Sequence, residues 1–120
     1  MEKQPFQLAA EQHGNVAVIR VEGYFGEKAG KQLLWEASRF FQADLTRFVL
    51  DFSTCDYINS IGLANLMDVT LKIVDDRQGR VFLAGVNQLM IDVINISGID
   101  EFAEYAPDAP TALRLLASTS

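Results

Sequence analysis

A serine followed closely by a glycine stands between an apolar run and a helical pattern in the middle of the chain. The stretch FVLDFSTCDYINSIGL (48–63) begins as a buried strand, passes through a short polar loop and ends where a helix should start, at Ser60. Unpaired N–H groups and the helix dipole favour negative charge at a helix N-terminus. A hydroxyl at this place can therefore carry a phosphate, which adds about −1.5 to −2 charges.

Ser60 also has a purely structural interpretation. A serine at an N-cap accepts a hydrogen bond from a backbone N–H two or three residues later and contributes about 1 kcal/mol. Leu63 occupies the position where Glu or Gln would complete a capping box. On sequence alone, the N-cap and the phosphoacceptor both remain open.

The pattern over residues 60–76 predicts an amphipathic helix that packs on a sheet. At about 100° per residue, its apolar and polar side chains separate onto opposite faces. The apolar face comprises Leu63, Leu66, Met67 and Val74. The polar stripe comprises Asn65, Asp68, Lys72, Asp75 and Asp76. We expect Leu63, Met67 and Val74 to be buried against the strand residues Val49, Leu50 and Phe82.

Ile61 falls in the middle of the polar stripe, directly after Ser60. An apolar cluster around a helix N-terminus is typical of a protein-binding surface. We therefore expect Ile61, Ala64, Asn65 and Asp68 to contact a partner. The alternative is that Ile61 tucks under the preceding loop, since a single exposed isoleucine carries little meaning by itself.

The composition fits one soluble globular domain spanning residues 1–120, with its core over about 5–117. The 120 residues are 49% hydrophobic and 22% charged, and the formal net charge is −6. This charge argues against nucleic acid and anionic membrane as partners, because both require a basic surface. No apolar run approaches the roughly 18 residues of a membrane span, so no membrane insertion is expected.

The inventory of reactive side chains is small. The chain has one cysteine, Cys55, and one histidine, His13, so we expect no disulfide, metal site or cofactor. His13 precedes Gly14 and is expected in a surface turn. The N-terminal residues contain no apolar signal core, and we expect a cytoplasmic protein.

Strand and helix patterns alternate along the chain. Strands are predicted over 6–12, 15–23, 47–52 and 80–85, with a short one within 99–107; helices are predicted from 27 for about four turns and over 60–76, 86–98 and 108–118. Gly79 and Gly98 should end two of the helices, and Asp108 should cap the last one, with Pro110 in its first turn. This order predicts an α/β or α+β layered domain.

The segment LDFSTCDYINSIGLANL (50–66) resembles the signature of STAS domains, in particular the bacterial anti-sigma-factor antagonists. In that signature an apolar strand ends in Asp-x-Ser, and Asp-Ser-Ser/Thr-Gly-Leu opens a helix after a short loop. Asp51 and Ser53 match the first part; Ser60, Gly62 and Leu63 match the second. VEGYF (21–25) and VFLAGVNQLMIDVINISGIDEFAEYAP (81–107) resemble further segments, so the resemblance covers roughly residues 5–117.

The resemblance implies a mixed sheet of four or five strands with about four helices packed on it. It also implies a partner switch. Family members bind a serine kinase that is also an anti-sigma factor, and this kinase uses ATP to phosphorylate the serine matching Ser60. The phosphorylated form lets go, and a metal-dependent serine phosphatase reverses the modification. The unphosphorylated antagonist sequesters the kinase and frees a sigma factor.

Three positions around the expected phosphosite depart from the family pattern. Asn59 replaces the acid before the serine. Gly26 replaces an acid near the first helix, although Glu27 follows at once. Ile61 replaces a second hydroxyl residue, which leaves Ser60 as the only hydroxyl at the turn. We expect Asn59, Ile61, Gly62 and Gly26 to surround a site that is less anionic than in the family.

The sequence is compatible with two classes of function and argues against a third. The favoured one is a phospho-switched antagonist of an anti-sigma factor. The second is a non-switching STAS scaffold, a subunit of a larger signalling or lipid-transport complex. An enzyme is not expected, because the sequence shows no catalytic triad, metal cluster or phosphate-binding glycine loop. Only the behaviour of Ser60 separates the first two classes.

Overall fold

Strands and helices alternate in the computed structural model, which describes residues 5–117. The strands are β1 (Phe6–His13), β2 (Val16–Phe25), β3 (Arg47–Ile58), β4 (Arg80–Ala84) and β5 (Glu104–Ala106). The helices are α1 (Glu27–Gln42), α2 (Ser60–Leu71), the π-helix η1 (Lys72–Asp76), α3 (Gln88–Ser97), the 3-10 helix η2 (Ile99–Glu101) and α4 (Ala109–Ala117). The predicted mixed sheet with four α-helices is confirmed.

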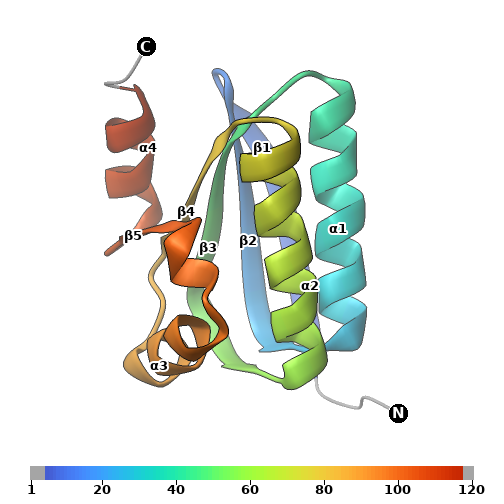
Figure 1. Ribbon diagram of the computed structural model, residues 1–120, viewed down its shortest axis with the longest axis vertical. Helices are drawn as coiled ribbons and strands as arrows, with labels where there is room; N and C mark the ends of the chain where they lie inside the picture. The colour runs from blue at the N-terminus through green and yellow to red at the C-terminus, as the bar shows by residue number, and fades with distance from the viewer. Residues whose placement is uncertain (1–4, 118–120) are drawn as a thin grey trace.

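The five strands form one sheet in the order β1-β2-β3-β4-β5. β1 is antiparallel to β2, and every other neighbouring pair is parallel. α1 and α2 lie side by side on one face, whereas α4 covers part of the other (Figure 1). Because β2 and β3 are parallel and are each followed by a helix, the starts of α1 and α2 meet at the same edge of the sheet (Figure 1).

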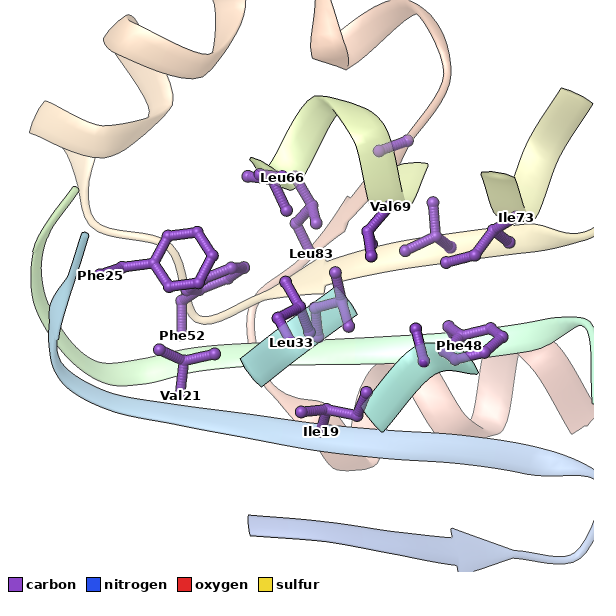
Figure 2. Close-up of a cluster of buried hydrophobic side chains, with 14 of the residues drawn as sticks. Ile19, Val21, Phe25, Leu33, Phe48, Phe52, Leu66, Val69, Ile73 and Leu83 are labelled. Atoms are coloured by element: carbon purple, nitrogen blue, oxygen red, sulfur yellow. The ribbon is translucent and has the colours of Figure 1, made fainter. Parts of the chain in front are cut away.

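The main core fills the layer between the sheet and the pair α1 and α2. Figure 2 shows side chains from the strands and both helices pointing into this layer. They include Ile19, Val21, Phe25, Phe48, Phe52, Leu83, Leu33, Leu66, Val69 and Ile73. A smaller cluster under α4 contains Val16, Val18, Val49, Phe82 and Leu116. Alternation along each strand explains the division, because successive side chains point to opposite faces.

The predicted buried face of α2 is wrong in detail. Leu66 is buried as predicted, and the other buried residues at the centre of this face are Val69 of α2 and Ile73 of η1. The predicted residues Leu63, Met67 and Val74 are only half-buried and pack at the margin of the main core.

The expected contacts of this face with the strands need the same correction. Of the three strand residues named, only Leu50 belongs to the main core. Val49 and Phe82 face α4 instead. Adjacent residues of one strand point to opposite faces, so Val49 and Leu50 cannot both contact the same helix.

β3 is longer than the sequence pattern indicates. The predicted polar loop continues as strand to Ile58, and the register with β2 shifts between Arg20 and Glu22 and again between Gly23 and Tyr24. These shifts place extra residues in β3, as bulges do. Phe52, Cys55 and Ile58, three residues apart, consequently all reach the core. A search for strict alternation misses such a strand.

The helix ends agree with the sequence in two of three places. Gly98 ends α3 with φ of 89°, and the Asp108 carboxylate accepts a hydrogen bond from the Thr111 N–H at 2.8 Å before α4. Gly79 does not have the predicted role, because Gln78 is the residue that takes the left-handed conformation. A Cβ on Gly79 would instead collide with the carbonyl of Thr46.

The corrected helix face gives a testable difference between two neighbours. Leu66→Ala should lower the free energy of unfolding by about 2–5 kcal/mol, because it empties a fully buried site. Met67→Ala should cost clearly less, since its side chain is only partly buried, at the margin of the core. Chemical denaturation of both variants measures the two values, and an equal or reversed order would contradict the assigned face.

Candidate functional site

Ser60 begins α2 at the edge of the sheet where β2 and β3 end (Figure 1). The strand register pairs Phe25 with Ile58, the last residues of these strands. Gly26 is the N-cap residue before α1, and Asn59 leads into α2. The fold thus brings Gly26 to the same edge of the sheet as the segment 59–62, which contains Ser60.

The carbonyl of Phe25 fixes the position of this segment. It accepts a hydrogen bond from the Asn59 N–H at 3.2 Å. It also lies against Gly62, where a Cβ would collide with the carbonyl oxygen and crowd the Phe25 ring. Gly62 is therefore required by a close approach between the start of α2 and the end of β2, and any larger side chain would push the helix away.

Asn59, and not Ser60, is the N-cap of α2. Its side-chain oxygen accepts a hydrogen bond from the Gly62 N–H at 2.8 Å, and its ψ of 177° is that of extended backbone. The interpretation of Ser60 as an N-cap is therefore wrong, because the preceding residue already fills that role. Ser60 is the first residue of the helix, and it is exposed to solvent.

The electrostatic surroundings of Ser60 favour an anion. The backbone N–H groups of Ser60 and Ile61 lie in the first turn, where the helix provides them no carbonyl partner. The first turn of α2 contains no acidic residue. Glu27, the acid at the start of α1, is ion-paired with Lys31 at 3.1 Å. A negative group on Ser60 would thus meet the positive end of the α2 dipole.

Ile61 lies on the surface beside Ser60, with half of its side chain exposed (50%). The alternative that it tucks under the preceding loop is therefore wrong. Ala64 and Asp68 are also exposed on α2. We call Ile61, Ala64 and Asp68 the α2 surface.

Asn65 differs from the other expected partner-binding residues. It is half-buried, and its amide lies over Gly30 of α1, where any Cβ would collide with it. Within residues 5–117 its buried side-chain nitrogen has no hydrogen-bond partner. Asn65 therefore belongs mainly to the contact between the two helices and not to the exposed polar stripe. A helical wheel cannot reveal this, because it contains no information on the neighbouring helix.

Sequence reasoning missed an aromatic pair near the same edge. Tyr24 and Tyr57 stack with ring centroids 5.5 Å apart, and Tyr57 is exposed. Each tyrosine directly precedes a core residue, Phe25 or Ile58, and so points to the opposite face of the sheet. The one signal for this pair in the sequence is that each tyrosine directly precedes a core residue of a strand. Because residues 53–59 were expected to form a loop, this signal was not recognised for Tyr57.

The described part of the chain offers little else for chemistry. Residues 5–117 contain no group of three or more His, Cys, Asp or Glu side chains that could hold a metal ion. None of the helices in this range is long and apolar enough to cross a membrane. Four hollows on the surface of this part of the chain have volumes of about 280–400 Å³, and Ser60 lines none of these four. The α2 start is thus the strongest candidate site.

Two substitutions of Asn59 distinguish the effect of its cap hydrogen bond from the effect of a negative charge at the same position. Asn59→Ala should destabilise the protein by about 1 kcal/mol, because the Gly62 N–H loses its partner. Asn59→Asp should retain the stability, since a carboxylate also caps and adds a favourable charge at the N-terminus. Thermal or chemical unfolding tests this, and equal losses in both variants would show that the side-chain oxygen is not the stabilising group.

Several solved structures share the fold. An anti-sigma factor antagonist from Mycobacterium paratuberculosis is 19% identical with a TM-score of 0.80, over 95% of this chain and 96% of that one. The anti-sigma factor antagonist SpoIIAA in its unphosphorylated form is 19% identical with a TM-score of 0.76, over 96% and 100%. Phosphorylated SpoIIAA from Bacillus is 22% identical, with a TM-score of 0.70, over 92% and 99%.

The same fold also occurs inside a much longer protein. The murine anion transporter Slc26a9 matches 91% of this chain but only 19% of its own length, with 12% identity and a TM-score of 0.73. At such low identities, these likenesses show a shared architecture. Function must be argued from the site.

The family is shown by the sequence itself. Comparison with curated proteins gave no match. The family model described as "Mlab, STAS domain" matches residues 8–114. This range extends from β1 into α4 and contains the whole Ser60 site. The chain belongs to the STAS domain family.

Proposed function

We propose that the protein is an anti-sigma-factor antagonist whose binding is switched by phosphorylation of Ser60. In the unphosphorylated state it sequesters a serine kinase that is also an anti-sigma factor. The observation that carries the proposal is the exposed Ser60 hydroxyl, released from capping by Asn59 and placed beside the exposed Ile61. The likeness of the fold to SpoIIAA in both unphosphorylated and phosphorylated forms supports the proposal.

The protein itself tolerates a phosphate at this position. The positive end of the α2 dipole stabilises an exposed anion by up to about 1 kcal/mol. The first turn contains no acidic side chain that would repel it. Phosphorylation therefore leaves the fold intact and changes only the surface that a partner meets.

A docked partner does not tolerate the same phosphate. The group adds about −1.5 to −2 charges next to Ile61, and docking would remove water from it. An uncompensated charge in an interface commonly costs about 2–5 kcal/mol, or roughly thirtyfold to several thousandfold in affinity. The kinase thus releases the modified protein, and a metal-dependent serine phosphatase restores binding.

In this proposal the protein acts by binding alone. It has no catalytic residue and requires no cofactor, because the kinase supplies the ATP and the phosphatase supplies its own metal. The partners are proteins in the cytoplasm, not nucleic acid or membrane, which agrees with the net charge of −6.

A non-switching STAS scaffold is the second candidate, and two residues favour it. Asn59 and Gly26 stand where the family pattern has acids, so the phosphosite lacks carboxylates that belong to the switching members. The matching family model is the one described as Mlab. In this candidate the α2 surface binds a larger signalling or lipid-transport complex permanently, and Ser60 is not modified.

Replacement of Ser60 distinguishes the two candidates. Ser60→Ala should bind the anti-sigma kinase constitutively, and Ser60→Asp should bind weakly, because a carboxylate imitates part of the phosphate charge. Incubation of the pair with ATP should add one phosphate to the wild type, and none to Ser60→Ala, by intact-mass measurement. If Ser60 stays unmodified and Ser60→Asp binds as tightly as wild type, the scaffold replaces the switch.

Ile61→Asp tests the α2 surface. It should weaken partner binding and change stability by no more than about 0.5 kcal/mol, as exposed substitutions usually do. Leu115→Asp is the matched control, because Leu115 is similarly exposed but lies on α4, across the sheet. Binding should persist in the control. A large fall in melting temperature for Ile61→Asp, or equal loss of binding in both variants, would exclude Ile61 as a specific contact.

A further inference from the structure

β1 forms a long edge of the sheet. Its eight residues pair with β2 in one unbroken antiparallel register from Phe6 to His13. Within residues 5–117, β1 has no second strand beside it. The opposite edge is different, because β5 has only three residues. A long, regular edge strand offers a row of backbone groups for pairing with another strand.

The outward backbone groups can be identified from the hydrogen bonds. The Pro5 carbonyl accepts a bond from the Tyr24 N–H at 3.0 Å. Because hydrogen-bonded pairs alternate in an antiparallel ladder, the odd-numbered residues of β1 bond to β2. The free edge therefore consists of the N–H and C=O groups of Phe6, Leu8, Ala10 and Gln12. We call these groups the β1 edge.

We propose that the β1 edge pairs antiparallel with the β1 edge of a second copy, about a two-fold axis at Ala9. This axis places Phe6 opposite Gln12 of the other copy, and Leu8 opposite Ala10. Every outward group of the four residues then has a partner. No other two-fold register uses the complete set, because a shift of the axis leaves one end unpaired.

The side chains are compatible with this register. On the face away from α1, Ala9 meets its own copy, and the Gln7 amide faces the Glu11 carboxylate. On the other face, the large Leu8 lies opposite the small Ala10. The two Glu11 residues are separated by four residue steps, about 14 Å at 3.4 Å per residue. This exceeds the Debye length of about 8 Å, so they scarcely repel one another.

β1 lacks the usual protection against such pairing. It contains no proline, lysine or bulge between Phe6 and His13. Its one acid, Glu11, is within 2.7 Å of His13 on the same strand. Natural edge strands are commonly blocked by charges, prolines or bulges. The absence of these features leaves the β1 edge open to pairing, and the opposition of Gln7 to Glu11 and of Leu8 to Ala10 in the two-fold register favours a second copy as the occupant.

The dimer would present two Ser60 sites at once. A two-fold axis perpendicular to the sheet keeps α1 and α2 of both copies on one face and points the two α2 starts in opposite directions. α2 follows β3, and β2 lies between β3 and β1 in the sheet. The contact between the two β1 strands therefore covers neither Ser60 site. Each dimer would thus have two binding sites for its partners.

Sedimentation equilibrium of the full chain tests the assembly. Wild type should have twice the chain mass of 13.3 kDa. Ala10→Pro removes one outward N–H, and proline is tolerated on the free side of an edge strand, so this variant should be a folded monomer by circular dichroism. If the wild type stays at 13.3 kDa over the whole concentration range, the proposal is wrong. A strand of another protein would then be the only remaining occupant for the β1 edge.

Cysteine cross-linking tests the register of the two β1 strands, and this test does not depend on whether the Ala10→Pro variant folds. Residues opposite each other in a non-hydrogen-bonded pair have Cα atoms about 4.5 Å apart, which permits a disulfide. Oxidised Ala9→Cys should therefore become a covalent dimer. Gln7→Cys and Glu11→Cys should each remain uncross-linked alone but should link when mixed.

Wild type is the control for cross-linking. Burial raises the pKa of the Cys55 thiol to about 11, so it should not form disulfides at neutral pH. A dimer that survives Ala10→Pro and gives no disulfide with Ala9→Cys would show that another surface associates, and the proposal would be wrong.

Discussion

The carbonyl of Phe25 is the point on which the candidate site depends. It receives the Asn59 N–H and lies against Gly62, so it joins the end of β2 to the start of α2. This contact exists only because β2 and β3 are parallel and end together. Ser60 and Ile61 stand between the two contacting residues. Their exposure is therefore a consequence of backbone packing and not of their own side-chain interactions.

Local patterns in the sequence were sufficient for the element order and for the start of α2 at Ser60. They failed where one element had to accommodate another. The bulges of β3 replace strict alternation by a spacing of three between Phe52, Cys55 and Ile58, and only the partner strand makes these bulges visible. The amide of Asn65 is likewise covered by Gly30, which is distant in sequence. Periodicity identifies a helix, but it does not determine which side chains at the border of its buried face contact the neighbouring elements.

Asn59 stands where the family pattern has an acid. The amide oxygen still caps α2 by its bond to Gly62. The negative charge is lost, so a phosphate on Ser60 would meet less repulsion from its neighbours. The STAS fold occurs both in antagonists of similar length and within the longer transporter Slc26a9.

An amide cap also makes the start of α2 indifferent to acidity. Hydrogen bonds from Thr111 lower the pKa of the Asp108 carboxyl, which caps α4. The stabilisation from that carboxylate is present above its unfolded pKa and disappears as the pH falls through the lowered folded pKa. Asn59 has no proton to gain over this range. As the solution becomes acidic, α4 should lose its cap hydrogen bond, while the Asn59 cap of α2 persists.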